Sequence, residues 1–175
     1  MQYHRANIPG ACYFFTVNLA ERNQSLLVDH IAELRLAFKQ TRQNHAFDII
    51  AIVVLPDHLH TMWQLPGNDA NFPMRWNLIK RRFSSALPKN ERISASRQKK
   101  GERGIWQRRY WEHLIRDDDF EHPVNYIHFN PVKHGYVRSA VDWPYSCIHR
   151  YVEKGIIANN WAYHEVGGDF GEICG

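Results

Sequence analysis

Two histidines, His58 and His60, are separated by one residue at the start of an apolar segment that favours a β-strand. Side chains at positions i and i+2 of a strand project from the same face, so the two imidazoles lie side by side. Neighbouring imidazoles on a rigid strand can supply two ligands of a metal site that keeps open positions for substrate. Two polar side chains on a solvated strand face would show the same spacing, and the chain has 11 histidines. The pair alone leaves both interpretations open.

A second pair of residues, Tyr126 and Asn130, lies four positions apart in a segment typical of a helix. At that spacing both side chains share one helix face. If that face lies over the open side of the sheet, Tyr126 approaches the metal and Asn130 supplies its third ligand. A tyrosine alone is usually a packing residue whose hydroxyl bonds to a neighbour. The combination of this pair with the two histidines favours a chemical role.

Positive charge is concentrated in residues 75–116, which hold 13 Lys/Arg against three acids and are interleaved with aromatic residues. Arginine and lysine neutralise phosphates, and aromatic rings stack on unpaired bases. The segment therefore favours a nucleic-acid partner, with a solvated basic loop as the alternative. The residues we expect to contact DNA are Arg75, Lys80, Arg81, Arg82, Trp106, Gln107, Arg108 and Arg109.

Length and composition indicate one folded domain, since 44% of the 175 residues are hydrophobic. We assign residues 1–163 to this domain, with 143–163 as a C-terminal extension, and expect the tail 164–175 to be disordered. No apolar stretch approaches the roughly 18 residues of a membrane span, and no secretory leader is visible. Three scattered cysteines fit neither a disulfide framework nor a zinc pattern, so the expected location is the reducing cytoplasm.

Periodicity and turn residues predict the elements that must position these side chains. Strands are expected at 13–19, 47–55, 58–65 and 105–115, and helices at 29–44, 73–85 and 117–129. The last helix is expected to stop before Asn130-Pro131, and 88–104 to form a mobile loop. This order predicts an α+β fold: a ferredoxin-like βαββαβ antiparallel sheet with helices on one face, plus an added helix that carries Tyr126.

Several segments, taken together, resemble one protein family. Leu55–His60 is similar to the HUH motif of HUH-class single-strand nucleases, and Tyr126–Gly135 resembles the tyrosine motif of the REP-associated tyrosine transposases. Shorter pieces of the same likeness lie at residues 9–17, 75–80, 104–109, 112–117 and 142–146. The likeness covers nearly all of residues 3–163, and the order and spacing of its pieces make it specific.

The resemblance implies roles for individual residues. By position, His58 and His60 would hold Mg²⁺ or Mn²⁺, with Asn130 as third ligand, and Tyr126 would be the nucleophile. The implied activity is that of a metal-dependent single-strand DNA endonuclease and strand transferase. It would act at REP-type palindromic hairpins through a 5′-phosphotyrosine intermediate. Pro123 lies near the start of the tyrosine helix, where it either kinks the chain or falls within the first turn.

Two other functions remain open from the sequence. One is a non-catalytic module of the same fold that binds REP hairpins or structured RNA. The other is a hydrolytic metallonuclease in which water is the nucleophile and Tyr126 only packs. We interpret His113, His128 and His134 as structural, with a DNA contact also possible for His113. The resemblance implies a monomer, although related insertion-sequence transposases pair the histidines of one subunit with the tyrosine helix of another. No membrane partner is expected.

Overall fold

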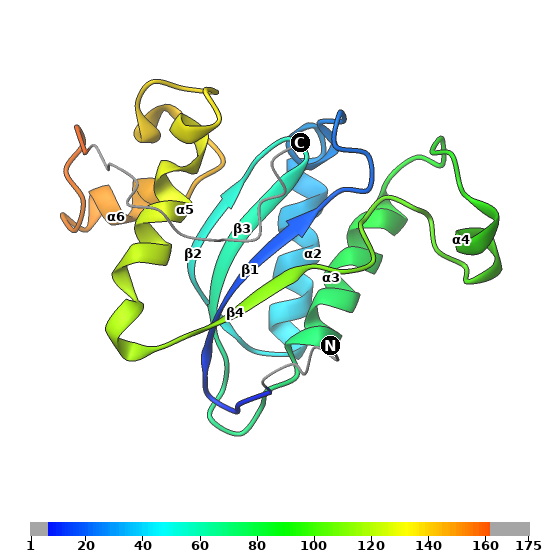
Figure 1. The fold of residues 1–175 in the computed structure, drawn as a ribbon, viewed down its shortest axis with the longest axis horizontal. Helices are drawn as coiled ribbons and strands as arrows, with labels where there is room; N and C mark the ends of the chain where they lie inside the picture. Colours follow the sequence, from blue (N-terminus) through cyan, green and yellow to red (C-terminus); the bar gives the residue numbers. More distant parts are fainter. Residues whose placement is uncertain (1–6, 162–175) are drawn as a thin grey trace, which may run out of the picture.

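Four strands of the described residues form one antiparallel sheet. The structure, a computed structural model, describes residues 7–161 of the chain. The strands are β1 (Cys12–Asn18), β2 (Asp48–Val54), β3 (His58–Gln64) and β4 (Trp111–Ile115). Their order across the sheet is β2-β3-β1-β4, and every neighbouring pair is antiparallel (Figure 1). This topology confirms the predicted ferredoxin-like α+β fold.

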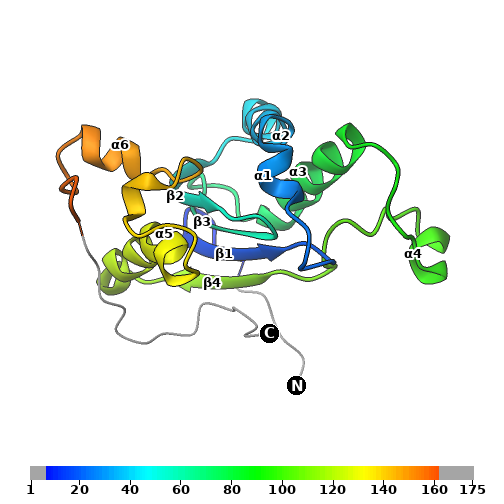
Figure 2. The same cartoon turned by 90° about the horizontal axis from the view of Figure 1, so that it is seen from above.

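Two helices, α2 (Ile31–Asn44) and α3 (Phe72–Ala86), cover one face of the sheet, with the short α1 (Leu26–Asp29) beside them (Figure 2). The α3 helix begins after Asn71, whose side chain accepts a hydrogen bond from a backbone N–H of the first turn. Its apolar residues recur at helical spacing and form a single buried face. Helix and sheet therefore share one apolar core on this side.

One long helix, α5 (Glu121–Lys133), lies on the opposite face of the sheet (Figure 2). Successive strand residues point to opposite faces, so the residues of β1 and β3 that turn away from α3 turn toward α5. Phe14 and Met62 pack there against Val124 and Ile127 of the helix. The predicted added helix is thus present, and it covers part of the face that the other helices leave open.

The start of α5 settles the position of its proline. A 3-10 turn, η1 (Asp117–Asp119), precedes the helix, which begins at Glu121 rather than at residue 117. Pro123 therefore falls within the first turn, where a missing backbone N–H leaves no helical hydrogen bond unmade. The helix is not kinked at this residue by a lost bond.

The predicted end of this helix is wrong, because α5 continues through Pro131 to Lys133. Pro131 is buried, and burial at this position offsets its unfavourable local preference. The carbonyl of Asn130 accepts a hydrogen bond from the N–H of His134 at 3.0 Å. Gly135, with φ of +73°, then ends the helix in the left-handed conformation that glycine favours.

The segment before β4 also differs from the sequence prediction. Only Trp111–Ile115 of the expected 105–115 strand is regular, and Trp106 forms an isolated bridge with Leu19. Backbone hydrogen bonds join this stretch to the end of β1 and the residues just after it, from the N–H of Gln107 to the carbonyl of Asn18 and from the N–H of Ala20 to the carbonyl of Ile105. The expected loop 88–104 contains the short helix α4 (Ala95–Lys99).

The C-terminal extension runs along the edge strand β2. Ser146 pairs with Val53 in an isolated antiparallel bridge, and η2 (Ala140–Asp142) and α6 (Ile148–Glu153) flank this contact. Covering an edge strand in this way protects it from pairing with other chains. The tail 164–175 lies outside the described residues. Among residues 7–161 no helix has the length and hydropathy needed to cross a membrane.

Candidate active site

His58 and His60 lie side by side on the face of β3 that is turned toward α5. Both side chains are buried, and their ring centroids are 5.0 Å apart. The sheet register places Thr16 opposite His60 and Asn18 opposite His58. Because β3 has a hydrogen-bonded neighbour on each side, the backbone that carries the pair is firmly held.

Each imidazole is held through its Nδ1 atom. Oδ1 of Asp57 lies 2.7 Å from Nδ1 of His58, and Oγ1 of Thr16 lies 2.8 Å from Nδ1 of His60. Contacts of this kind fix the orientation of histidines that bind metals, and they leave Nε2 as the ligating atom. Nε2 of His58 is buried and has no hydrogen-bond partner within the described part of the chain.

Asp57 is the centre of a charged network behind His58. The Arg22 guanidinium forms an ion pair with Asp57 and also donates to Oδ1 of Asn18 at 3.0 Å. Burial acts to raise the pKa of Asp57, but hydrogen bonds with His58 and Arg22 bring it down to about 2. Burial lowers the pKa of His58 despite the opposing effect of Asp57. His58 is therefore neutral near pH 7, which is the form that binds a metal.

Helix α5 brings Tyr126 and Asn130 to the same face of the sheet. Both side chains are buried, and their four-residue spacing puts them one turn apart on one helix face. The Tyr126 ring centroid lies 5.4 Å from that of His60 and 6.1 Å from that of Phe14. One chain thus assembles the predicted tyrosine next to the predicted histidine pair.

Sequence reasoning missed a further residue of this site, Lys133. Its Nζ atom donates a hydrogen bond to Oη of Tyr126 at 3.0 Å and lies 4.7 Å from the centroid of the same ring. Residues 126, 130 and 133 follow an i, i+4, i+7 pattern, and this spacing could have identified Lys133 as a third residue of the same helix face.

The three histidines interpreted as structural lie in different surroundings. His128 turns away from Tyr126, and its Nε2 lies 3.4 Å from Sγ of Cys147. His113 is exposed and stacks on Trp111, with ring centroids 5.5 Å apart and an interplanar angle of 5°. The His134 ring, by contrast, lies 5.2 Å from the His58 ring and therefore borders the site.

The side chains present fit a divalent metal ion. Within residues 7–161 no group of three or more His, Cys, Asp or Glu side chains has the arrangement of a metal site. A third protein ligand would therefore come from another residue type, and the amide of Asn130 lies on the facing helix. The buried Nε2 atom of His58 matches a ligand whose partner is a metal ion.

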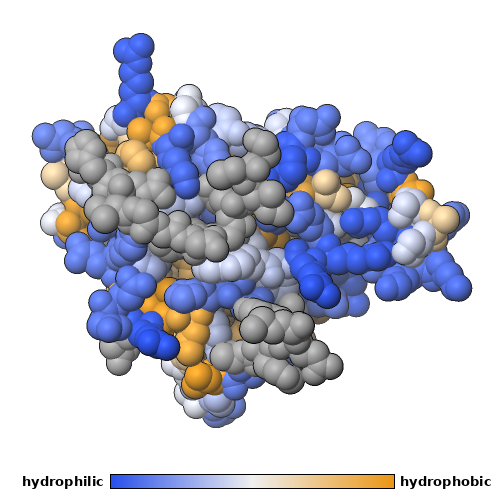
Figure 3. All heavy atoms as spheres, in the orientation of Figure 1, coloured by the Kyte–Doolittle hydropathy of each residue, from blue (hydrophilic) through white to orange (hydrophobic). Residues whose placement is uncertain are grey.

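Most of the expected DNA-contacting residues line one hollow beside α3. The hollow has a volume of about 470 Å³ and lies between α3 and residues 97–108. Arg108 is exposed and forms an ion pair with Glu102 at 2.9 Å, while Arg82 bonds to Thr41 on the α2 side. Figure 3 shows mainly hydrophilic residues over the part of the molecule around α4. The expected residues in the wall are Lys80, Arg81, Trp106, Gln107 and Arg108.

Arg75 is buried, with 1% of its surface exposed, although the charge pattern suggested a phosphate contact. Its guanidinium donates to the carbonyls of Ala46 and Asn71 at 2.8 and 3.0 Å and pairs with Asp69 at 2.8 Å. These contacts hold α3 to the preceding loop and to the turn after α2. We therefore leave Arg75 out of the proposed DNA-contacting set.

Three aromatic residues of the basic segment, Trp76, Phe83 and Trp106, are also placed differently from the expectation. Trp76 and Phe83 are fully buried, and Trp106 is 6% exposed. Their rings belong to the core under α3 and cannot stack on bases there. The interleaved pattern of charged and aromatic residues reflects one amphipathic helix and the segment that packs beside it.

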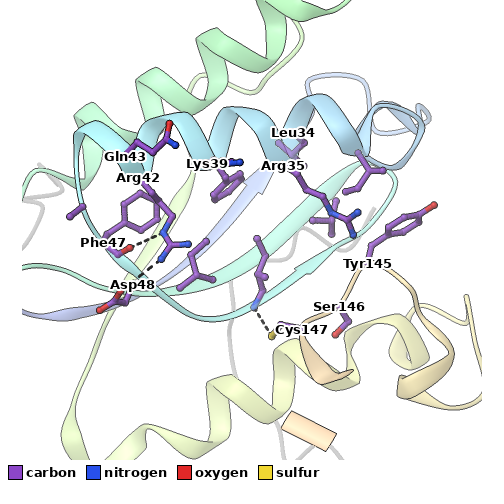
Figure 4. Close-up of a pocket in the computed structure, with 16 residues that line it drawn as sticks. Leu34, Arg35, Lys39, Arg42, Gln43, Phe47, Asp48, Tyr145, Ser146 and Cys147 are labelled. Carbon is purple, nitrogen blue, oxygen red and sulfur yellow. Dashed lines mark hydrogen bonds and ion pairs between the residues drawn. The ribbon is translucent and has the colours of Figure 1, made fainter. Parts of the chain in front are cut away.

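A larger hollow, of about 620 Å³, lies between α2 and the edge strand β2 (Figure 4). Apolar side chains such as Phe38 and Phe47 line it. Arg35, Lys39 and Arg42 lie along α2 at its edge. None of the catalytic residues expected from the sequence lines this hollow. The histidine pair, Tyr126 and Asn130 lie on the other side of the sheet.

Comparison with known proteins agrees with this geometry. The profile of the family described as "Transposase IS200 like" matches residues 10–130. A Haemophilus influenzae protein assigned to the REP-associated tyrosine transposases is 49% identical over 161 residues, which cover 91% of this chain and 92% of that protein. The REP-associated tyrosine transposase of Escherichia coli K12 is 42% identical over 162 residues, or 92% and 90% of the two chains.

A solved structure, of a REP-associated tyrosine transposase bound to a REP hairpin, extends the likeness to three dimensions. It matches with a TM-score of 0.80 at 39% identity, over 99% of this chain and 95% of that one. The two histidines, the facing tyrosine and these matches over nearly the whole length lead to one assignment. This chain belongs to the REP-associated tyrosine transposases of the IS200-like transposase family.

Proposed function

We propose that this transposase cuts and rejoins single-stranded DNA at REP-type hairpins, with Tyr126 as its nucleophile. The observation that carries the proposal is the position of Tyr126, with its ring centroid 5.4 Å from that of His60 and its hydroxyl bound by Lys133. The hairpin substrate is supported by the solved relative, which is bound to a REP hairpin and matches 99% of this chain.

The proposed reaction begins when Oη of Tyr126 attacks the scissile phosphorus. The bond from phosphorus to the 3′-oxygen breaks, which leaves a free 3′-OH on one strand and a 5′-phosphotyrosine on the other. Because the covalent link keeps the energy of the phosphodiester, another 3′-OH can displace the tyrosine without ATP. Asp57 and Thr16 keep the two imidazoles oriented throughout.

We propose Mg²⁺ or Mn²⁺ as the ion, with His58, His60 and Asn130 as its protein ligands. Such an ion, when bound, would polarise a non-bridging oxygen of the scissile phosphate. Tyr126 and these three side chains are all buried, so a DNA phosphate reaches them only after the groups that cover them move apart. Hairpin binding would thus have to open the site before the strand is cut.

The hairpin phosphates are proposed to lie along the hollow beside α3. Arg81 and Arg109 are exposed for phosphate contacts, and Arg108 is exposed too but would have to exchange its ion pair with Glu102 for a phosphate. Lys80 has a different setting, since it donates to the carbonyl of Gln107 at 3.0 Å and lies over the Trp106 ring. We therefore assign Trp106 and Gln107 the role of holding Lys80 in place.

The single strand next to the hairpin is proposed to pass over β4. Trp111 and His113 form a stacked pair on the face of β4 that is turned toward the site, and Phe14 lies between Trp111 and Tyr126. Stacked rings beside a basic groove suit unpaired bases. This arrangement would lead the strand from the hairpin to the tyrosine.

Labelled DNA tests the proposal and separates the three candidate functions. Single-stranded REP-type DNA carrying a label on either side of the cut is incubated with the protein and Mn²⁺. We expect a covalent adduct that keeps the label on the 3′ side of the cut, because the tyrosine takes the 5′-phosphate. Cleavage without an adduct would support attack by water, and hairpin binding without cleavage would support a binding module.

We also propose that residues 1–163 work as one domain and that a monomer suffices for cleavage. The site draws Tyr126 and both histidines from a single chain, which is the observation behind this proposal. Mixing Tyr126→Phe with His60→Ala protein tests it. No recovery of cleavage is expected from the mixture, whereas recovery would indicate a dimer that shares its sites. The cytoplasm remains the proposed location.

A further inference from the structure

The contact between Lys133 and Tyr126 joins a cation to the atom proposed to react. Nζ of Lys133 lies 3.0 Å from Oη of Tyr126 and 4.7 Å from the ring centroid, so the ammonium group is close to both the oxygen and the ring. Lysine side chains in helices lean toward the N-terminus, which allows a residue seven positions later to reach back to the tyrosine.

The usual structural role of a lysine at a helix end does not explain the contact of Lys133 with Tyr126. Lysine is common in the last turn of a helix, where its charge interacts favourably with the exposed carbonyls. That role requires no contact with a side chain two turns earlier. Here the ammonium group also donates a hydrogen bond to the tyrosine hydroxyl.

We propose that Lys133 is a catalytic residue that binds the Tyr126 oxygen and stabilises the negative charge this oxygen carries as it enters and leaves its bond to phosphorus. The inference rests on the proposed function, since it takes Tyr126 as the nucleophile. It extends that function by naming the group that makes a phenol, which is a weak nucleophile when protonated, able to attack.

The positive charge of Lys133 acts in both cleavage and rejoining. In cleavage, Tyr126 loses its proton to water, Oη bonds to phosphorus, the bond to the 3′-oxygen breaks, and the 3′-oxygen takes a proton from water. In rejoining, a 3′-OH loses its proton to water and bonds to phosphorus, the bond from phosphorus to Oη breaks, and the departing Tyr126 phenolate then takes a proton from water. Lys133 stays an ammonium ion throughout, so it moves no proton and is unchanged at the end.

Other side chains of the site contact the Tyr126 ring or lie around the histidine pair. His60 of β3 faces the ring, while the contact from β1 comes from the uncharged Phe14. His134 lies next to His58, and Asp57 is engaged by Arg22 and His58. Lys133 is thus a cation that the structure places directly on the oxygen.

Single-turnover cleavage of a REP-type hairpin by Lys133→Met tests the proposal. We expect the rate of adduct formation to fall about 10- to 100-fold, with hairpin affinity unchanged. Lys133→Arg keeps the charge, so it should recover part of the rate. Lys154→Met is the matched control, since Lys154 is an exposed lysine at the end of another helix, α6, and should keep the wild-type rate.

A fluorinated tyrosine at position 126 separates charge stabilisation from structural support. Fluorine makes the phenol oxygen bear negative charge more easily, so the loss caused by Lys133→Met should shrink when residue 126 is 3-fluorotyrosine. An equal loss with both tyrosines would overturn the proposal, as would an unchanged rate or a loss that lies wholly in hairpin affinity. Rejoining from the isolated covalent intermediate should slow in parallel.

The proposed function and this inference fail in different ways. If wild-type protein forms no adduct, or if Tyr126→Phe still forms one, Tyr126 is not the nucleophile and the proposed function is wrong. If the adduct forms at Tyr126 but Lys133→Met behaves like Lys154→Met, only the role of Lys133 is wrong.

Discussion

Alternating residues of the same strands form the two faces of the sheet, and the two faces bury different kinds of side chain. On β3, Leu59 and Trp63 point into the core under α2 and α3, while His58 and His60 point toward α5. The first face is filled by aromatic rings, such as the Trp63–Trp76 stack with centroids 4.4 Å apart. The second face contains buried polar side chains, and hydrogen bonds to Asp57 and Thr16 hold His58 and His60 in place.

This difference shows how one sheet serves both stability and chemistry. Burying a polar group costs free energy unless it is hydrogen-bonded, and each imidazole meets part of that cost through Nδ1. The face under α2 and α3 contributes most of the burial of large apolar side chains. Changes on the α3 face should therefore affect unfolding, and changes on the α5 face should affect cleavage.

The largest expected effect is on cleavage, from His60→Ala. Removing a proposed metal ligand should lower the Mn²⁺-dependent rate by about 1000-fold or more, because the ion can no longer be held beside Tyr126. Single-turnover cleavage measures the loss, and hairpin affinity should be retained. His30→Ala, at the start of α2, is the control and should cut at the wild-type rate. Equal losses in both variants would contradict the separation of the two faces.

Trp76→Ala should instead lower the stability of the fold and leave the cleavage rate unchanged. Loss of this fully buried ring should lower the free energy of unfolding by about 3–5 kcal/mol, through lost burial and the cavity left behind. Urea unfolding gives the value. At a temperature where the variant remains folded, its cleavage rate should equal that of wild type. A fall in cleavage rate as large as that of His60→Ala would contradict the separation of roles between the two faces.

Asp57→Asn tests the support behind the histidine pair. Asn cannot hold the His58 ring by a charged contact, so the half-maximal Mn²⁺ concentration for cleavage should rise about 10- to 100-fold. Asp48→Asn is matched to it, since Asp48 is an exposed residue of β2 with only a 3.8 Å ion pair to Arg42. This second variant should need no more Mn²⁺ than wild type. Indistinguishable metal requirements would mean that Asp57 does not orient His58.

The smallest effect concerns a pair away from both faces, Glu91 and Arg103. The hydrogen bond from Arg103 holds the pKa of Glu91 at about 2, below its usual 4.5. A lowered folded-state pKa stabilises the fold above about pH 4.5, and this contribution is lost as the pH falls from 4.5 toward 2. Glu91→Gln should therefore lower the unfolding free energy by about 1 kcal/mol at pH 7. If the difference in unfolding free energy between wild type and Glu91→Gln is as large at pH 2.5 as at pH 7, this lowered pKa is contradicted.

Much of the site could be predicted because its signals are local. The two-residue spacing of His58 and His60 and the four-residue spacing of Tyr126 and Asn130 fix which side chains share a face. Those spacings stay valid once the strand and the helix form. Lys133 follows the same rule and was missed only because a lysine at a helix end is ordinary.

Other features depended on contacts between distant segments. The burial of Arg75 is set by carbonyls of Ala46 and His45, about 30 residues earlier, and nothing in a basic run reveals them. Aromatic residues between basic ones occur both in base-stacking surfaces and in amphipathic helices, so burial of Trp76 could not be read from the pattern. The continuation of α5 through Pro131 likewise reflects tertiary burial rather than local preference.

The central claim, that Tyr126 is the nucleophile, is tested most directly by locating the covalent link. Wild-type protein is reacted with a short REP-type single strand and Mn²⁺, digested, and analysed by tandem mass spectrometry. The account predicts one nucleotide-modified peptide, with the added mass on Tyr126 and none in Tyr126→Phe protein. Modification at another residue, or full cleavage without any modified peptide, would contradict it.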